Sequence, residues 1–130
     1  MAELQRVLHV DDDDDIRVIA GIALEDVGQF TVCLCPSGPD AIAQAPEFRP
    51  DLFLLDYMMP GMDGQETARR LRAIPGLESV PVVFMTARVQ GDITDKLLDL
   101  GAIGVIAKPF DPMTLADELR SHWQRHQDTR

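Results

Sequence analysis

The chain has 130 residues, of which 45% are hydrophobic and 26% charged, the composition of one folded globular domain rather than of a disordered or fibrous protein. Its formal net charge of -10 argues against direct nucleic-acid binding, because phosphate backbones attract clusters of Lys and Arg. No apolar run is long enough to span a membrane and the first residues lack the features of a signal peptide, so we expect a cytoplasmic protein without a membrane partner.

Short apolar runs and helical patterns alternate through the first half of the chain. Residues 6–10 are predicted to form a buried strand, 30–35 a second strand and 51–55 a third, which is apolar over residues 52–55 and ends at Asp56. Between the first two strands, a helical stripe is formed by Ile16, Ile19, Ala20, Ala23 and Val27, which Asp14 or Asp15 can cap at its start and Gly28 at its end. A brief helix with Ala41, Ile42 and Ala45 follows the second strand and is limited by Pro46.

The same alternation continues to the end of the chain. Helical stripes are formed by Thr67, Ala68, Leu71 and Ile74, by Ile93, Leu97 and Leu100, and by Leu115, Ala116, Leu119 and Trp123, with strands at 80–85 and 104–107. Five strand–helix units predict an α/β fold, a doubly wound five-stranded parallel sheet of flavodoxin-like order 2-1-3-4-5. We expect a single domain over 1–130, with a core at about 6–123 and a polar, frayed tail at 124–130.

Polar residues stand where four of these strands end. Asp11 and Asp12 follow the first strand, Asp56 the third, Thr86 the fourth and Lys108 the fifth. In an open parallel sheet, ligands bind at the carboxyl ends of the strands. Three carboxylates gathered there repel one another unless a cation lies between them. Oxygen ligands without cysteine or histidine favour Mg²⁺, or Mn²⁺ in its place.

This set of side chains suits phosphoryl transfer. A carboxylate can attack phosphorus to give an acyl phosphate, and a metal ion together with an ammonium group would neutralise the charge of the transferring oxygens. Thr86 could donate a hydrogen bond to the new phosphoryl group.

Four motifs resemble those of response-regulator receiver domains, of the single-domain kind found in chemotaxis regulators. They are Val10-Asp11-Asp12-Asp13, Leu54 to Gly64 (LLDYMMPGMDG), Met85-Thr86-Ala87 and Lys108-Pro109-Phe110. The resemblance implies that Asp56 accepts a phosphoryl group from a histidine kinase or a histidine phosphotransfer protein in a two-component or phosphorelay system. It also implies that Asp11, Asp12, Asp56 and the backbone carbonyl of Met58 hold Mg²⁺, and that Thr86 and Lys108 contact the phosphoryl group.

Further expectations come from the same resemblance. Lys108-Pro109 would be a cis peptide, and Met58 and Arg88 would tune the phosphoryl lifetime by gating water. An output protein would bind the face formed by residues 93–100 and 105–123. Val105 stands where receivers often carry Tyr or Phe, so the route by which the signal leaves the site is open.

Two other functions fit parts of the pattern. Asp11-x-Asp13 superficially resembles the motif of haloacid-dehalogenase-type phosphotransferases, although Asp56 would then have no role. A pseudo-receiver would keep the fold as a binding module without being phosphorylated. We interpret the protein as a signalling switch that catalyses only its own phosphorylation and dephosphorylation rather than as an enzyme. Cys33 and Cys35 are expected to be reduced structural thiols, and His122 and His126 to be surface residues.

Overall fold

Short apolar runs form the five strands of one parallel sheet in the computed structural model, which describes residues 3–87 and 91–129. The strands are β1 (Arg6–Val10), β2 (Thr31–Cys35), β3 (Leu52–Asp56), β4 (Val82–Thr86) and β5 (Gly104–Ala107). Their order is β2-β1-β3-β4-β5, and all neighbouring pairs are parallel. The predicted doubly wound fold is confirmed, with β1 and β3 adjacent where the strand order reverses.

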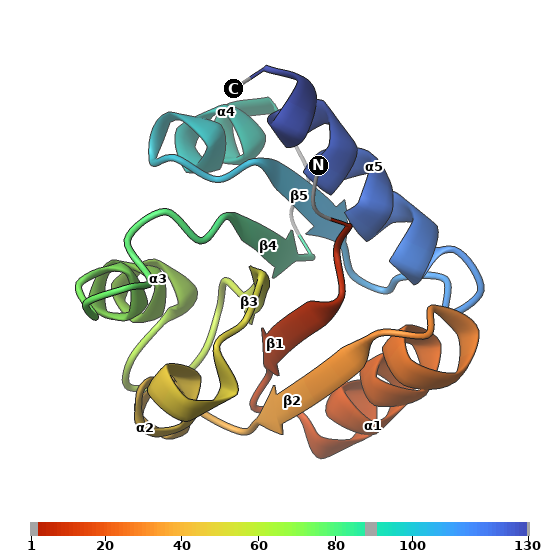
Figure 1. Ribbon diagram of the computed structural model, residues 1–130, viewed down its shortest axis with the longest axis horizontal. Coiled ribbons are helices and arrows are strands. Elements are labelled where there is room, and N and C mark those ends of the chain that lie inside the picture. The colour runs from red at the N-terminus through yellow and green to blue at the C-terminus, as the bar shows by residue number, and fades with distance from the viewer. Residues whose placement is uncertain (1–2, 88–90, 130) are drawn as a thin grey trace.

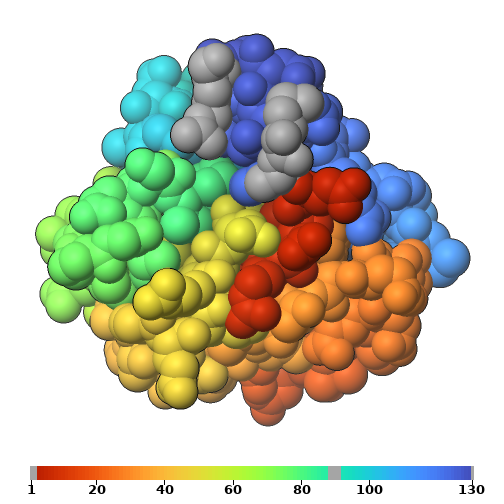
Figure 2. All heavy atoms as spheres, viewed as in Figure 1, coloured from red at the N-terminus to blue at the C-terminus, as the bar shows by residue number. Residues whose placement is uncertain are grey.

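Helices cover both faces of this sheet (Figure 1). They are α1 (Asp14–Ile22), continued by the π-helical segment η1 (Ala23–Val27), α2 (Gly38–Phe48), α3 (Gly64–Arg72), α4 (Gly91–Asp99) and α5 (Leu115–Asp128). One core cluster packs α1 and α5 against the sheet, and a second packs α2, α3 and α4 against the other face. Figure 2 shows α1 (orange-red) and α5 (blue) enclosing one side of the molecule. Within the described residues, no helix is long and apolar enough to cross a membrane.

The first helix differs from its prediction in its cap and in its buried face. Asp13, rather than Asp14 or Asp15, is the N-cap, and its Oδ1 accepts hydrogen bonds from the amides of Asp15 (2.9 Å) and Ile16 (3.1 Å). Of the predicted stripe, Ala20 and Ala23 are buried, whereas Ile19 and Val27 are exposed. A π-turn holds one residue more than an α-turn, so η1 rotates the end of the helix and turns Val27 to solvent.

Two other helices run past their predicted ends. Pro46 lies inside α2, and the helix stops instead at Arg49, which adopts a left-handed conformation and donates its amide to Ala45 O at 2.9 Å. Proline removes one backbone donor, and one missing hydrogen bond does not end a helix whose face is held in the core. Likewise α5 continues to Asp128, where Gln124 Nε2 donates to Asp128 Oδ1 at 3.0 Å, although a frayed tail was expected from residue 124. The single-domain assignment stays a prediction.

Candidate functional site

The carboxyl ends of β1 and β3 bring three carboxylates together. One oxygen from each of Asp11, Asp12 and Asp56 lies within 4.8 Å of the others. Asp11 is fully buried and Asp56 is 3% exposed, whereas Asp12 is exposed. The sheet produces this arrangement because β1 and β3 are paired in register from Val7 opposite Leu52 to Val10 opposite Leu55, so the residues after each strand meet at one edge.

Lys108 joins the cluster from the end of β5. Its Nζ lies 3.1 Å from Asp11 Oδ2 and 3.3 Å from Asp56 Oδ2. Partial burial by itself lowers the pKa of Lys108, but the ion pairs with Asp11 and Asp56 outweigh burial and raise that pKa. The ammonium group is therefore firmly charged. The Lys108-Pro109 peptide is cis, as the resemblance implied.

The surroundings of Asp56 disfavour its ionised form. Burial, followed by repulsion from Asp11, raises the pKa of Asp56 from its ordinary 3.8 to about 6, while Lys108 and the backbone amide of Met58 act in the opposite direction. One ammonium group therefore does not compensate the acidic cluster fully. A further cation among these oxygens would lower the free energy of the ionised site.

Thr86 completes the edge between β4 and β5. It is 3% exposed, and its carbonyl accepts the amide of Lys108 at 2.9 Å, which ties the hydroxyl-bearing residue to the lysine through the backbone. Val105 is half-buried and lies opposite Phe84 in the β4–β5 register, packed with the α2–α3–α4 core. Met58 is 70% exposed beside Asp56. Arg88, expected to gate water together with Met58, lies outside the described residues.

The loop after Asp56 approaches the strand closely. Gly64, the first residue of α3, donates its amide to Tyr57 O at 2.9 Å. A side chain at this position would overlap the backbone carbonyl of Asp56, so the close approach requires glycine. The helix is capped by Asp63, which accepts the amide of Glu66 at 2.9 Å. In the sequence, Asp63 and Gly64 belong to the motif LLDYMMPGMDG, which by itself indicates neither the helix cap nor the close approach.

Two residues without a predicted role in the site, Asp13 and Arg17, support Asp11, and a third, His9, is buried close by. The amide of Asp13 donates to Asp11 Oδ1 at 2.9 Å, and Arg17 Nη1 donates to Asp11 O at 2.8 Å. Arg17 follows Asp11 by six residues and lies one turn into α1. That spacing was the one signal in the sequence that could have placed its guanidinium group near Asp11. His9 is fully buried two residues before Asp11, with Nδ1 3.0 Å from Leu54 O and Nε2 without a partner among residues 3–87 and 91–129. Burial lowers the pKa of His9 to about 4.

The other candidate ligands stay apart from the carboxylate cluster. Cys33 and Cys35 are free thiols with their Sγ atoms 3.8 Å apart on β2, in keeping with the expected reduced thiols. His122 pairs with Arg125, whose Nη2 lies 2.8 Å from His122 Nδ1. Over residues 3–87 and 91–129, the three aspartates form the only group of side chains that could hold a metal ion.

The chemistry of this donor set fits a small hard cation. All three side chains offer carboxylate oxygens, one of them exposed, so that water can complete the coordination shell. In addition, the three carboxylates carry more formal negative charge than the single ammonium group of Lys108 balances. Mg²⁺, or Mn²⁺ in its place, satisfies both observations.

The comparisons with known proteins agree with this geometry. Residues 7–120 match the family model described as the response regulator receiver domain. The chain belongs to this family. Among solved structures, the chemotaxis response regulator CheY4 of Vibrio cholerae superposes with a TM-score of 0.83 at 30% identity, covering 91% of this chain and 98% of that one. The receiver fold and its place in two-component signalling are thereby established.

Two curated relatives have names that describe DNA-linked proteins. The DNA-binding response regulator MtrA of Mycolicibacterium smegmatis is 40% identical over 126 residues, covering 95% of this chain and 53% of MtrA. The transcriptional regulatory protein CseB of Streptomyces avermitilis is 38% identical, covering 96% of this chain and 52% of CseB. The receiver thus spans about half the length of these relatives.

These relatives overturn the expectation of no direct nucleic-acid partner. That expectation came from the net charge of -10, which describes these 130 residues alone. Proteins that share this receiver extend well beyond it, and one is named as DNA-binding. The net charge of the receiver carries no information about the surface of the remainder of such a protein. The inference from net charge to the absence of a nucleic-acid partner was therefore wrong.

Proposed function

We propose that this receiver accepts a phosphoryl group on Asp56 from a phosphohistidine of a kinase or phosphotransfer protein. The observation that carries the proposal is the position of Asp56, buried between a second buried carboxylate and Lys108, with its Oδ2 3.3 Å from the ammonium nitrogen. Oδ1 or Oδ2 would attack phosphorus, the phosphorus–nitrogen bond would break and the imidazole would leave. Asp56 must be ionised to attack, and a cation bound among the three carboxylates would favour that ionised form.

Each neighbour of Asp56 has a distinct task in this step. Asp11, Asp12 and Asp56, with the backbone carbonyl of Met58, would hold Mg²⁺. When bound, Mg²⁺ neutralises charge on the phosphoryl oxygens. Lys108 is already within ion-pair distance of Asp56 and would bind a phosphoryl oxygen after transfer. The Thr86 hydroxyl would donate a hydrogen bond to the same phosphoryl group. A movement of Thr86 on phosphorylation would reach Lys108 through the backbone hydrogen bond between the two residues.

The geometry speaks against the haloacid-dehalogenase alternative. The side chain of Asp13 accepts two amides of α1 as the helix cap, so it is committed to the helix rather than positioned as an acid or base. Asp56, which that alternative leaves without a role, lies at the centre of the cluster. A receiver that catalyses only its own phosphorylation and dephosphorylation agrees better with these contacts.

The output of the phosphorylated receiver is also a proposal. We infer that phosphorylation controls DNA binding by a part of the protein outside these 130 residues, in keeping with the name of MtrA. The receiver would act as the switch that controls this binding. The cytoplasmic location stays a prediction.

Intact-mass analysis after incubation with acetyl phosphate tests the phosphorylation proposal. The parent should gain one phosphoryl group with Mg²⁺ and none with a chelator, and Asp56→Asn should gain none. Asp99→Asn is the matched control, because Asp99 is an exposed aspartate on α4, and it should label like the parent. An unlabelled parent would support the pseudo-receiver, and a labelled Asp56→Asn would place the acceptor elsewhere. Steady release of phosphate from small phosphoesters would support the haloacid-dehalogenase type.

A further inference from the structure

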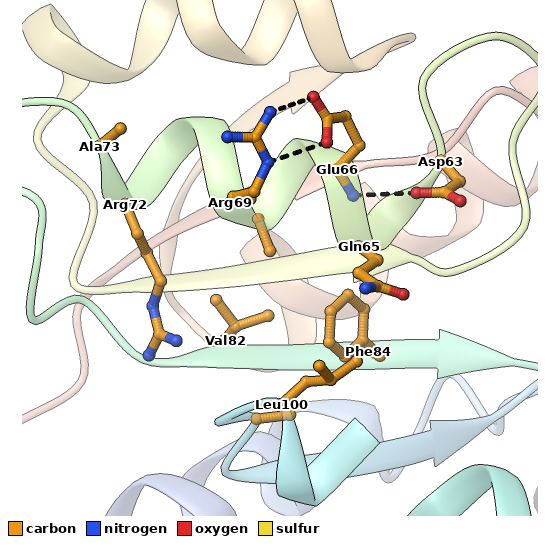
Figure 3. A pocket seen from close by; sticks show the side chains of 11 residues that line it. Asp63, Gln65, Glu66, Arg69, Arg72, Ala73, Val82, Phe84 and Leu100 are labelled. Atoms are coloured by element: carbon orange, nitrogen blue, oxygen red, sulfur yellow. Dashed lines mark hydrogen bonds and ion pairs between the residues drawn. The ribbon is translucent and has the colours of Figure 1, made fainter. Parts of the chain in front are cut away.

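A cavity of about 690 Å³ lies along α3, on the face of the sheet that α2, α3 and α4 cover (Figure 3). Val82 and Phe84 of β4 form its floor, Ala68 of α3 one wall, and Leu100 and Ala102 the opposite wall. The volume is in the range of roughly 300–1,000 Å³ that small-molecule sites occupy, and an apolar lining with a few polar groups is typical of them. The carboxylates of the phosphorylation site are not part of this lining.

Two of the charged groups at the cavity are already paired. Glu66 Oε2 lies 2.6 Å from both Arg69 Nη2 and Arg70 Nε. Figure 3 shows the Glu66–Arg69 pair on α3 and, apart from it, Arg72 extending toward the start of β4. One end of the cavity therefore holds the Glu66–Arg69 ion pair, and the other end holds Arg72.

Arg72 is half-buried and has no counter-charge in the part of the chain that the structure describes. Its Nε donates to Val80 O in a long hydrogen bond of 3.4 Å, and no carboxylate of the described residues lies within 4.0 Å of its guanidinium. Burial lowers the pKa of Arg72, yet the guanidinium group stays protonated at neutral pH. A partly desolvated cation without an anion is unfavourable, and its remaining donors match the two oxygens of a carboxylate.

We propose that this cavity binds a small amphipathic carboxylate, with its carboxylate paired to Arg72 and its apolar body against Leu100 and Ala73. The occupant contacts mainly the outer part of the cavity, because Val82 and Phe84 are only 1% and 3% exposed, whereas Leu100 is 45% exposed. It carries one negative charge rather than several, since a single guanidinium group is uncompensated and the rim also holds Asp63 and Glu66. The proposal is independent of the phosphorylation of Asp56.

Octanoate is a suitable probe, with octan-1-ol and octylamine as neutral and cationic probes of equal chain length. Titration of the isotope-labelled protein, followed by amide NMR shifts, gives both the affinity and the location. For a ligand of this size we expect a dissociation constant on the order of 1 mM. Shifts should concentrate at Ala73, Val82 and Ala102, and the alcohol and the amine should bind at least about tenfold more weakly than octanoate.

Three variants separate the proposed contact from general effects. Arg72→Gln should weaken octanoate binding about tenfold, as the loss of a charge-assisted hydrogen bond implies. Arg69→Gln is the matched control, because Arg69 lines the same cavity but is paired with Glu66, and it should change the affinity less than about twofold. Ala73→Phe places a large side chain at the exposed rim and should abolish binding without altering the core.

The outcomes decide the proposal. Selective octanoate binding that is weakened by Arg72→Gln and blocked by Ala73→Phe, in proteins with unchanged circular dichroism, supports the site. Equal binding of the amine and the carboxylate, shifts centred away from α3 and β4, or equal effects of the two arginine substitutions would overturn it. Absence of octanoate binding at millimolar concentration would also overturn it.

Discussion

Replacing the proposed phosphoacceptor should stabilise the protein. In the metal-free protein at pH 7, ionised Asp56 is buried and close to Asp11, which raises the pKa of Asp56 from 3.8 to about 6. A shift of that size corresponds to a penalty of about 3 kcal/mol in the free energy of unfolding at pH 7. Asn resembles the protonated carboxyl group and escapes the penalty. Asp56→Asn should therefore raise the melting temperature by about 10 °C for a chain of this length.

The sign of the pH dependence follows from the same shift. The folded state holds the proton more tightly than the unfolded state, so the penalty is absent below pH 4, grows as the pH rises from about 4 to about 6, and is complete at pH 7. The increase in the free energy of unfolding caused by Asp56→Asn should depend on pH in the same way. Effects of other titrating groups, such as buried His9, are common to both proteins and largely cancel in the difference.

Urea denaturation at several pH values with a chelator measures this difference directly. Asp99→Asn, the exposed control on α4, should change the free energy of unfolding by less than about 0.5 kcal/mol. Adding Mg²⁺ at ten times its dissociation constant should stabilise the parent by about 1.4 kcal/mol and Asp56→Asn by less. The electrostatic reasoning fails if Asp56→Asn is no more stable than the parent at pH 7, or if its advantage persists unchanged at pH 4.

Three other predictions concern contacts around the site. Asp13→Ala removes the cap of α1 and should lower the free energy of unfolding in urea by about 1 kcal/mol, more than Asp15→Ala does. Gly64→Ala should slow labelling by acetyl phosphate, measured by mass spectrometry, because the new methyl group displaces the Asp56 carbonyl; unchanged labelling would contradict this reading. In an NMR pH titration His9 should stay neutral until about pH 4, and titration near its ordinary value of 6.5 would show that the ring is not buried.

Much of the site could be predicted because strands end where apolar runs end. Asp11, Asp56 and Lys108 come directly after such runs, and parallel strands bring the residues at their carboxyl ends to a single edge of the sheet. Their convergence needed only the strand order, which strict alternation of strands and helices implies. Helix ends and buried faces were less predictable. At Val27 the predicted stripe of the first helix failed because η1 changes the helical phase, a feature of backbone hydrogen bonding that side-chain spacing does not reveal.

Sequence alone therefore determined the fold, the family and the set of polar residues at one edge of the sheet, since these depend on local patterns repeated along the chain. Tertiary structure decided how charged each group is and what each contacts. The raised pKa of Asp56, the support of Asp11 by Arg17 and the lone charge of Arg72 beside a cavity all depend on which helix packs against which strand. These properties depend on how deeply each group is buried and on its distance from residues far away in the sequence. Both quantities are defined only once the chain has folded.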